Sequence, residues 1–149
     1  MLPQYQDARH EVRDGIIDII TNLAENNQMG LEAIKSNSVA DLQSVREKLK
    51  GLNNTTETID NKIVLIFVKF TPEARDLREI VSYLKITSAL NRIQTNINSY
   101  IKNMQLVVIE DNSEMKEFIN DSLLINQCTL NAFGYTIDML KTFDDNDKI

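Results

Sequence analysis

The stretch that decides the fold is residues 42–70, LQSVREKLKGLNNTTETIDNKIVLIFVKF, in which apolar side chains recur at alternating intervals of three and four. These intervals place the recurring side chains on one face of a helix. The recurring positions are Leu42, Val45, Leu49, Leu52, Thr56, Ile59, Ile63, Ile66 and Phe70, of which only Thr56 is polar. A helix over 38–70 would be about 50 Å long at ~1.5 Å per residue. Only neighbouring helices of similar length can cover such a face.

Capping residues and prolines predict where the other helices begin. Ser38, followed three residues later by Asp41, indicates a helix start in the manner of a capping box. The stretch Thr71-Pro72-Glu73 indicates another, because it combines an N-cap oxygen, a proline at the first helical position and an acid in the first turn. Pro3 and the stretch Asp111-Asn112-Ser113-Glu114 indicate two more. The predicted helices span 3–35, 38–70, 72–106 and 113–143.

Each of these segments carries its own apolar face, and few residues break the helical pattern. The 149-residue chain has only four glycines and two prolines. Gly15, Gly30 and Gly51 fall inside or near helical pattern, where a bend or a close approach of two helices is expected. Long amphipathic helices joined by short polar links predict an all-α, antiparallel up-down helical bundle.

Charge and hydropathy exclude several classes of function. The chain has 22 acidic and 16 basic residues, a net charge of −6, and no basic run, which excludes a nucleic-acid partner. Its longest nearly uninterrupted apolar run, residues 63–68, is far shorter than the ~20 residues that a membrane span needs. No basic segment leads into an apolar one at the N-terminus. We therefore expect a soluble, cytoplasmic protein without membrane insertion.

The sequence contains no recognisable catalytic motif. Cys128 and His10 are the only cysteine and histidine, so an internal disulfide and a Cys/His zinc site are both excluded. A nucleophile elbow, a P-loop and a dinucleotide-binding glycine motif are also missing. We expect the protein not to be an enzyme, His10 to be a solvated surface residue, and Cys128 to be small and partly buried.

A neutral polar stripe runs beside the apolar face of the third segment. Asn91, Thr95 and Asn98 fall on this stripe, and all three are polar but uncharged. Asparagine gains little in a helix interior, because its side chain competes with the backbone for hydrogen bonds. Something other than helix propensity must therefore account for these residues.

The third segment resembles a known family. The stretches 71–80 (TPEARDLREI), 84–86 (LKI) and 90–93 (LNRI) resemble the third helix of PhoU, the regulator of bacterial phosphate uptake and signalling. The spacing from Pro72 to Ile93 agrees with the family without a gap. The resemblance covers residues 2–106 as one three-helix unit, and 111–149 resembles the first helix of a second unit. Because the family has two tandem units, the resemblance implies either a fragment or a short relative.

The resemblance also marks positions where family members bind metal. Two of them, which form a Glu-x-x-x-Asp pair in the family, are Asn91 and Thr95 here, and a third, on the preceding helix, is Asn53. Neutral amides and hydroxyls lack the charge that a hard or transition cation needs. We therefore expect no cofactor. A bundle that binds iron, zinc or manganese remains an alternative.

By resemblance, the function is that of a non-enzymatic regulatory or adaptor protein that docks on a transporter ATPase or a sensor kinase. Arg75, Asp76, Arg78 and Arg92 match the family motif directly. They either form a partner-binding or anion-binding patch or serve the bundle, with Asp76 at the helix start and the arginines paired with acids across it. We expect a homo-oligomer. A plain oligomerisation module, using the apolar face of 42–70 between chains, is a further alternative.

Overall fold

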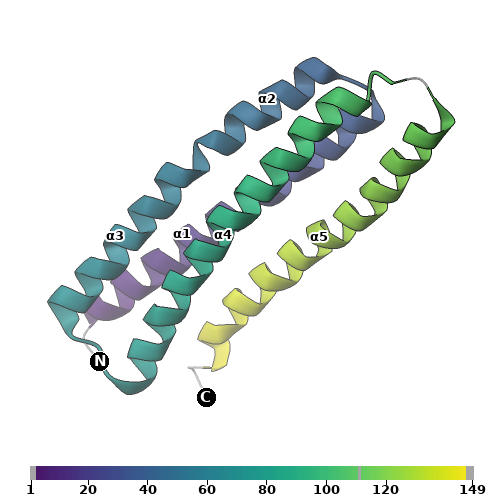
Figure 1. Ribbon diagram of the computed structural model, residues 1–149. Coiled ribbons are helices and arrows are strands. Elements are labelled where there is room, and N and C mark those ends of the chain that lie inside the picture. The colour runs from purple at the N-terminus through teal and green to yellow at the C-terminus, as the bar shows by residue number, and fades with distance from the viewer. Residues whose placement is uncertain (1–2, 111, 147–149) are drawn as a thin grey trace.

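The computed structural model describes residues 3–110 and 112–146 as five helices. The helices are α1 (Pro3–Lys35), α2 (Val39–Lys50), α3 (Leu52–Phe70), α4 (Ala74–Val107) and α5 (Ser113–Asn146). Figure 1 shows them running side by side, with the chain reversing direction between α1 and α2, α3 and α4, and α4 and α5. The predicted all-α up-down bundle is confirmed. Leu2, Asp111 and 147–149, which belong to the two predicted units, lie outside the described residues.

The predicted single helix over 38–70 is wrong in one respect, because it divides at Gly51 into α2 and α3. Gly51 keeps helical dihedral angles, φ −71° and ψ −15°, so the two helices remain nearly in line (Figure 1). The amide of Gln94 in α4 donates to the Leu49 carbonyl oxygen at 3.0 Å. This tertiary hydrogen bond satisfies a carbonyl beside the break, where the helix's own ladder is irregular.

The predicted start of the third helix at Thr71 and Pro72 is also displaced. Thr71 has φ 45° and ψ 59°, a left-handed conformation that ends α3. The helix α4 begins only at Ala74, and Glu73 precedes it without a capping hydrogen bond from its side chain. The turn signal was therefore correct, but Thr71 terminates the preceding helix. It does not cap the following one.

Two other predicted caps are confirmed by hydrogen bonds. Ser38 Oγ accepts from the Asp41 backbone amide at 3.2 Å at the start of α2. Asn112 Oδ1 accepts from the Met115 amide at 2.8 Å at the start of α5. These short polar side chains satisfy backbone donors that the first turn of a helix leaves unpaired.

The core surrounds α1, which packs against α2, α3, α4 and α5. The helices approach closely at two glycines of α1: a methyl group at Gly30 would lie 3.0 Å from Ile101 Cδ1, and one at Gly15 would overlap Ile59 Cδ1. The face that begins at Leu42 is buried in this core except for half-buried Phe70. That face packs within the chain, so the idea that it joins separate chains is wrong.

The last helix is attached differently from the others. α5 packs along α1 but touches α4 only slightly, and it continues to Asn146, beyond its predicted end at 143. Figure 1 shows α5 at one edge of the bundle, with α2 and α3 at the opposite edge. A surface therefore remains open between α4 and α5.

Candidate docking surfaces and family metal positions

Of the three positions that the family resemblance marks for metal, only Asn91 makes a side-chain hydrogen bond between α3 and α4, while Asn53 and Thr95 are exposed. Thr56 Oγ1 donates to Asn91 Oδ1 at 2.6 Å and also lies 2.8 Å from the carbonyl oxygen of Asn53. Thr95 Oγ1 donates to the Asn91 carbonyl oxygen at 3.0 Å. The side chain of Asn91 is therefore used to hold α3 against α4, which explains a polar residue that helix propensity does not favour.

The donors around this contact do not fit a metal cation. Within residues 3–110 and 112–146, no three His, Cys, Asp or Glu side chains lie close enough together to hold one. The nearby carboxylate of Asp60, one turn along α3, accepts from Thr87 Oγ1 at 2.5 Å. Further along the interface, Arg46 donates to Asn98 Oδ1 at 3.1 Å. These side chains form a polar seam between α2–α3 and α4. Asp60 is the one carboxylate among them, and a hard cation would need several charged ligands close together.

The motif at the start of α4 is divided between two faces of the helix. Arg75 and Arg78 are exposed, whereas Asp76 is half-buried in the first turn. The charge of Asp76 contributes, after burial, to raising the pKa of Tyr5 to about 12. The carboxylate thus acts on the N-terminal end of α1 as well as on its own helix start. The arginines remain the candidates for contact with a partner.

A buried ion pair joins this motif to α1, and the sequence did not indicate it. Arg9 Nη1 donates to Glu79 Oε2 at 2.9 Å, and the Arg9 residue is only 6% exposed. Tyr83 donates from its hydroxyl to Glu79 Oε1 at 2.9 Å. Burial and the negative charge of Glu79 raise the pKa of Tyr83. A signal was present in the i, i+4 spacing of Glu79 and Tyr83, but nothing in the sequence identified Arg9 as their partner.

A basic ridge runs along the outward face of α4. Arg78, Lys85 and Arg92 recur every seven residues and are all exposed, so neighbouring members lie roughly 10 Å apart along the helix. Between Glu79 and Glu110 the sequence has no acidic residue. The ridge is therefore a region of positive charge on a chain whose net charge is −6.

A groove of about 800 Å³ lies between α4 and α5. Its walls are mostly apolar, and its polar side chains are uncharged. Tyr100 and Ser122 cross its floor, with 2.9 Å between the two hydroxyl oxygens. Burial raises the pKa of Tyr100. The groove is lined by Ile93, Asn96, Ile97, Tyr100, Asn103, Met104, Leu106, Val107, Phe118, Ser122, Ile125, Asn126 and Thr129.

One polar pair fixes α5 on α1. Asn27 Nδ2 donates to Asn126 Oδ1 at 2.5 Å, and Asn126 Nδ2 donates to Asn27 Oδ1 at 3.1 Å. Both residues interrupt the apolar faces of their own helices, and each interruption faces the other. Two other predictions from the sequence are wrong. Cys128 is exposed, not partly buried, and His10 is half-buried, not fully solvated.

The described residues form long antiparallel helices that pack side by side. The chain is therefore an all-α helical-bundle protein. The PhoU domain matches residues 16–104, more than half of the chain, and the chain belongs to this family. The match lies inside the predicted three-helix unit and ends before α5. Comparison with curated proteins and with solved structures gives no significant match. Within the described residues, no helix combines the length and the apolar character that a membrane crossing requires.

Proposed function

We propose that this protein is a non-enzymatic, cytoplasmic regulator of phosphate uptake and phosphate-responsive signalling that acts by docking on a transporter ATPase or a sensor kinase. Membership of the PhoU family supports the regulatory role. The absence of catalytic sequence motifs and of a cluster of metal-binding side chains in the described residues is compatible with it. The observation that carries the proposal is the division of the family motif in α4, which directs Arg75 and Arg78 outward.

The docking face combines charge with exposed apolar area. Leu77 and Leu84 of α4 are partly exposed, and Val68 of neighbouring α3 is 76% exposed. Apolar side chains together with arginines are typical of surfaces that bind proteins, because arginine offers a charged, planar guanidinium group and an aliphatic stem for packing. Arg75 and Arg78 favour an acidic partner surface, since a like-charged surface would be repelled.

A pull-down against the transporter ATPase and the sensor kinase of the phosphate system tests this proposal. The double variant Arg75→Glu, Arg78→Glu should lose most of the capture, because it reverses two charges at the proposed face without touching the core. The double variant Lys48→Glu, Lys50→Glu makes the same charge change on exposed positions of α2 and should retain capture. Equal capture by both variants would contradict the proposed face, provided that circular dichroism shows both to be folded.

A further inference from the structure

The middle of α5 is uncharged on all sides, yet only one side is covered. Residues 122–137 contain no acidic or basic residue. The face toward α1 is occupied by Ile119, Phe133 and Leu140, which are buried. Apolar side chains on several sides of a helix normally indicate that more than one side is buried. α5 therefore has two further faces that lack a neighbour within the described chain.

The first of these faces forms one wall of the groove. Phe118 is 54% exposed and Ile125 is 72% exposed, and both side chains line the groove. The opposite wall is a heptad stripe on α4 that is equally free of charge, made of Ile93, Asn96, Tyr100, Asn103 and Val107. From 93 to 107 this wall is about 20 Å long at ~1.5 Å per residue. The groove thus has the shape and the apolar lining that a helix fits.

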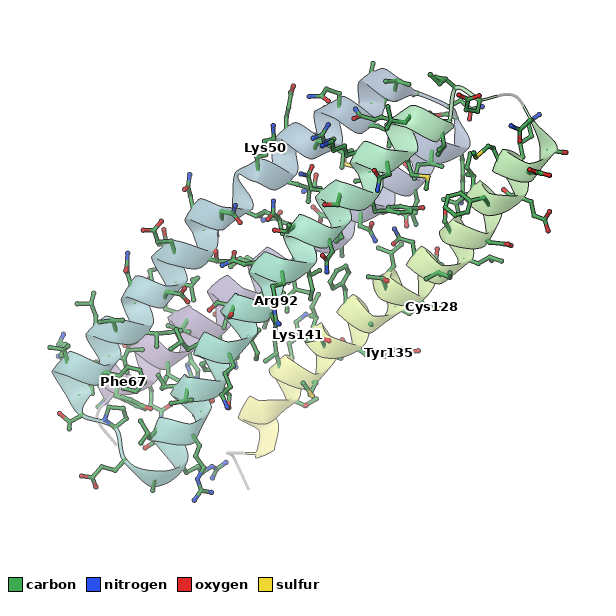
Figure 2. All side chains as sticks on the ribbon, viewed as in Figure 1. Lys50, Phe67, Arg92, Cys128, Tyr135 and Lys141 are labelled. Carbon is green, nitrogen blue, oxygen red and sulfur yellow. The ribbon has the colours of Figure 1, made fainter. Side chains whose placement is uncertain are left out.

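The second uncovered face of α5 points away from the groove and from α1. Leu124 is 70% exposed and Tyr135 is 74% exposed. Met139, also half-exposed, lies on the same side of the helix, since 124, 128, 135 and 139 are separated by four, seven and four residues. Figure 2 shows Cys128 and Tyr135 on the outer side of α5, away from α1–α4.

We propose that the groove is filled by α5 of a second copy of this chain, so that two copies form a dimer about a twofold axis through the middle of α5. In this arrangement the groove face of each α5 packs against the other α5. The outer face, with Leu124 and Tyr135, then packs against α4 of the second copy. One helix therefore covers both free faces of its counterpart, which makes the surface self-complementary, as a twofold interface requires.

The charges at the two ends of the groove favour the same occupant. The start of α5, 113–121, carries three exposed acids, Glu114, Glu117 and Asp121, against one exposed base, Lys116. The N-terminal half of α4 carries exposed Lys85 and Arg92. A twofold axis through the middle of α5 makes the two α5 helices antiparallel. The acidic start of one α5 then runs beside the basic half of the other copy's α4. Opposite charges at both ends set the register, and the apolar middle supplies the buried area.

Light scattering on the purified chain over a dilution series tests the proposal. The unaltered chain should have twice its mass of 17.1 kDa, and Ile125→Glu should be monomeric, because it places a charge inside the interface. Leu65→Glu is the matched control, since Leu65 is 64% exposed on α3, far from the groove. A monomeric unaltered chain would overturn the proposal. So would a dimer that Leu65→Glu dissociates and Ile125→Glu does not.

A cross-linking experiment tests the geometry separately. In a Cys128→Ser background, Thr129→Cys should form a disulfide-linked dimer under mild oxidation, because Thr129 lies on the groove face near the proposed axis. Gln127→Cys, on the exposed polar side of the same helix, should not. Cross-linking of the control alone would overturn the antiparallel arrangement. Both experiments use the isolated chain and no partner protein. The dimer proposal can therefore fail while the proposed regulatory function stands, and the reverse also holds.

Discussion

The unit formed by α1–α4 and the helix α5 are built from the same heptad pattern, but their apolar faces are covered to different extents. In the unit, each helix finds neighbours inside the chain, and a polar seam through Thr56 and Asn91 accompanies the apolar contacts. α5 has a single full contact, with α1, which includes the Asn27–Asn126 pair, and one hydroxyl pair, Tyr100–Ser122, with α4. The family match follows the same division, because it ends at residue 104 and leaves α5 outside. The comparison shows that a heptad pattern predicts a buried face without saying which chain buries it.

The largest expected effect is a difference in the free energy of unfolding between a variant in the α1–α4 unit and a variant in α5. Leu49→Ala should lower the free energy of unfolding by about 2–5 kcal/mol, because Leu49 is fully buried and its removal leaves a cavity. Leu124→Ala in the monomeric Ile125→Glu background should change it by less than about 0.5 kcal/mol. Urea unfolding measures both. Equal losses for the two variants would show that α5 is covered within one chain.

The next effect concerns the pair that attaches α5 to α1. Asn27→Ala should cost about 1–3 kcal/mol, because it leaves the half-buried amide of Asn126 without its partner. Asn22→Ala, at an exposed position of the same helix, is the control. If the two variants unfold at the same urea concentration, the pair contributes nothing to holding α5.

A smaller effect appears at alkaline pH. The folded state raises the pKa of Tyr5 from 10.0 to about 12, so the folded protein keeps this proton where the unfolded chain loses it. Stability is therefore complete below about pH 10 and falls as the pH rises toward 12. Tyr5→Phe should reduce this loss, whereas Tyr135→Phe, at an exposed position of α5, should not. Unfolding midpoints at a series of pH values compare the variants, and identical profiles would contradict the assignment to Tyr5.

The smallest expected effect is that of added metal. Iron, zinc or manganese should leave the melting temperature unchanged, because Asn91 and Thr95 offer neutral donors, and the Asn91 side chain is already bonded to Thr56. Asn91→Glu together with Thr95→Asp restores the family's carboxylates and should produce a saturable rise. A rise of several degrees for the unaltered chain would contradict the prediction.

Much of the fold could be predicted from sequence, because it depends on local signals. The heptad spacing identified the helices, and Ser38 marked a helix start through a hydrogen bond that spans only three residues. The break at Gly51 was harder to predict, since the carbonyl beside it is bonded by Gln94, which is distant in sequence. Thr71 was assigned to the wrong helix because the same residue type can end one helix and begin the next.

The candidate surfaces were only partly predictable, for a related reason. The motif at the start of α4 identified Arg75 and Arg78, but only the structure shows that they point outward while Glu79 turns inward to Arg9. The groove could not be predicted at all. It arises because α5 packs along α1 and touches α4 only slightly, and the contact with α1 includes the Asn27–Asn126 pair, whose members are 99 residues apart.

Hydrogen exchange at two protein concentrations tests most directly whether the unit is complete in one chain and α5 is not. On dilution below the dissociation constant of the dimer, amide protection in the middle of α5 should fall, while protection in α1, α3 and the buried half of α4 should stay constant. Protection of α5 that does not depend on concentration, in a chain shown to be monomeric, would contradict this account.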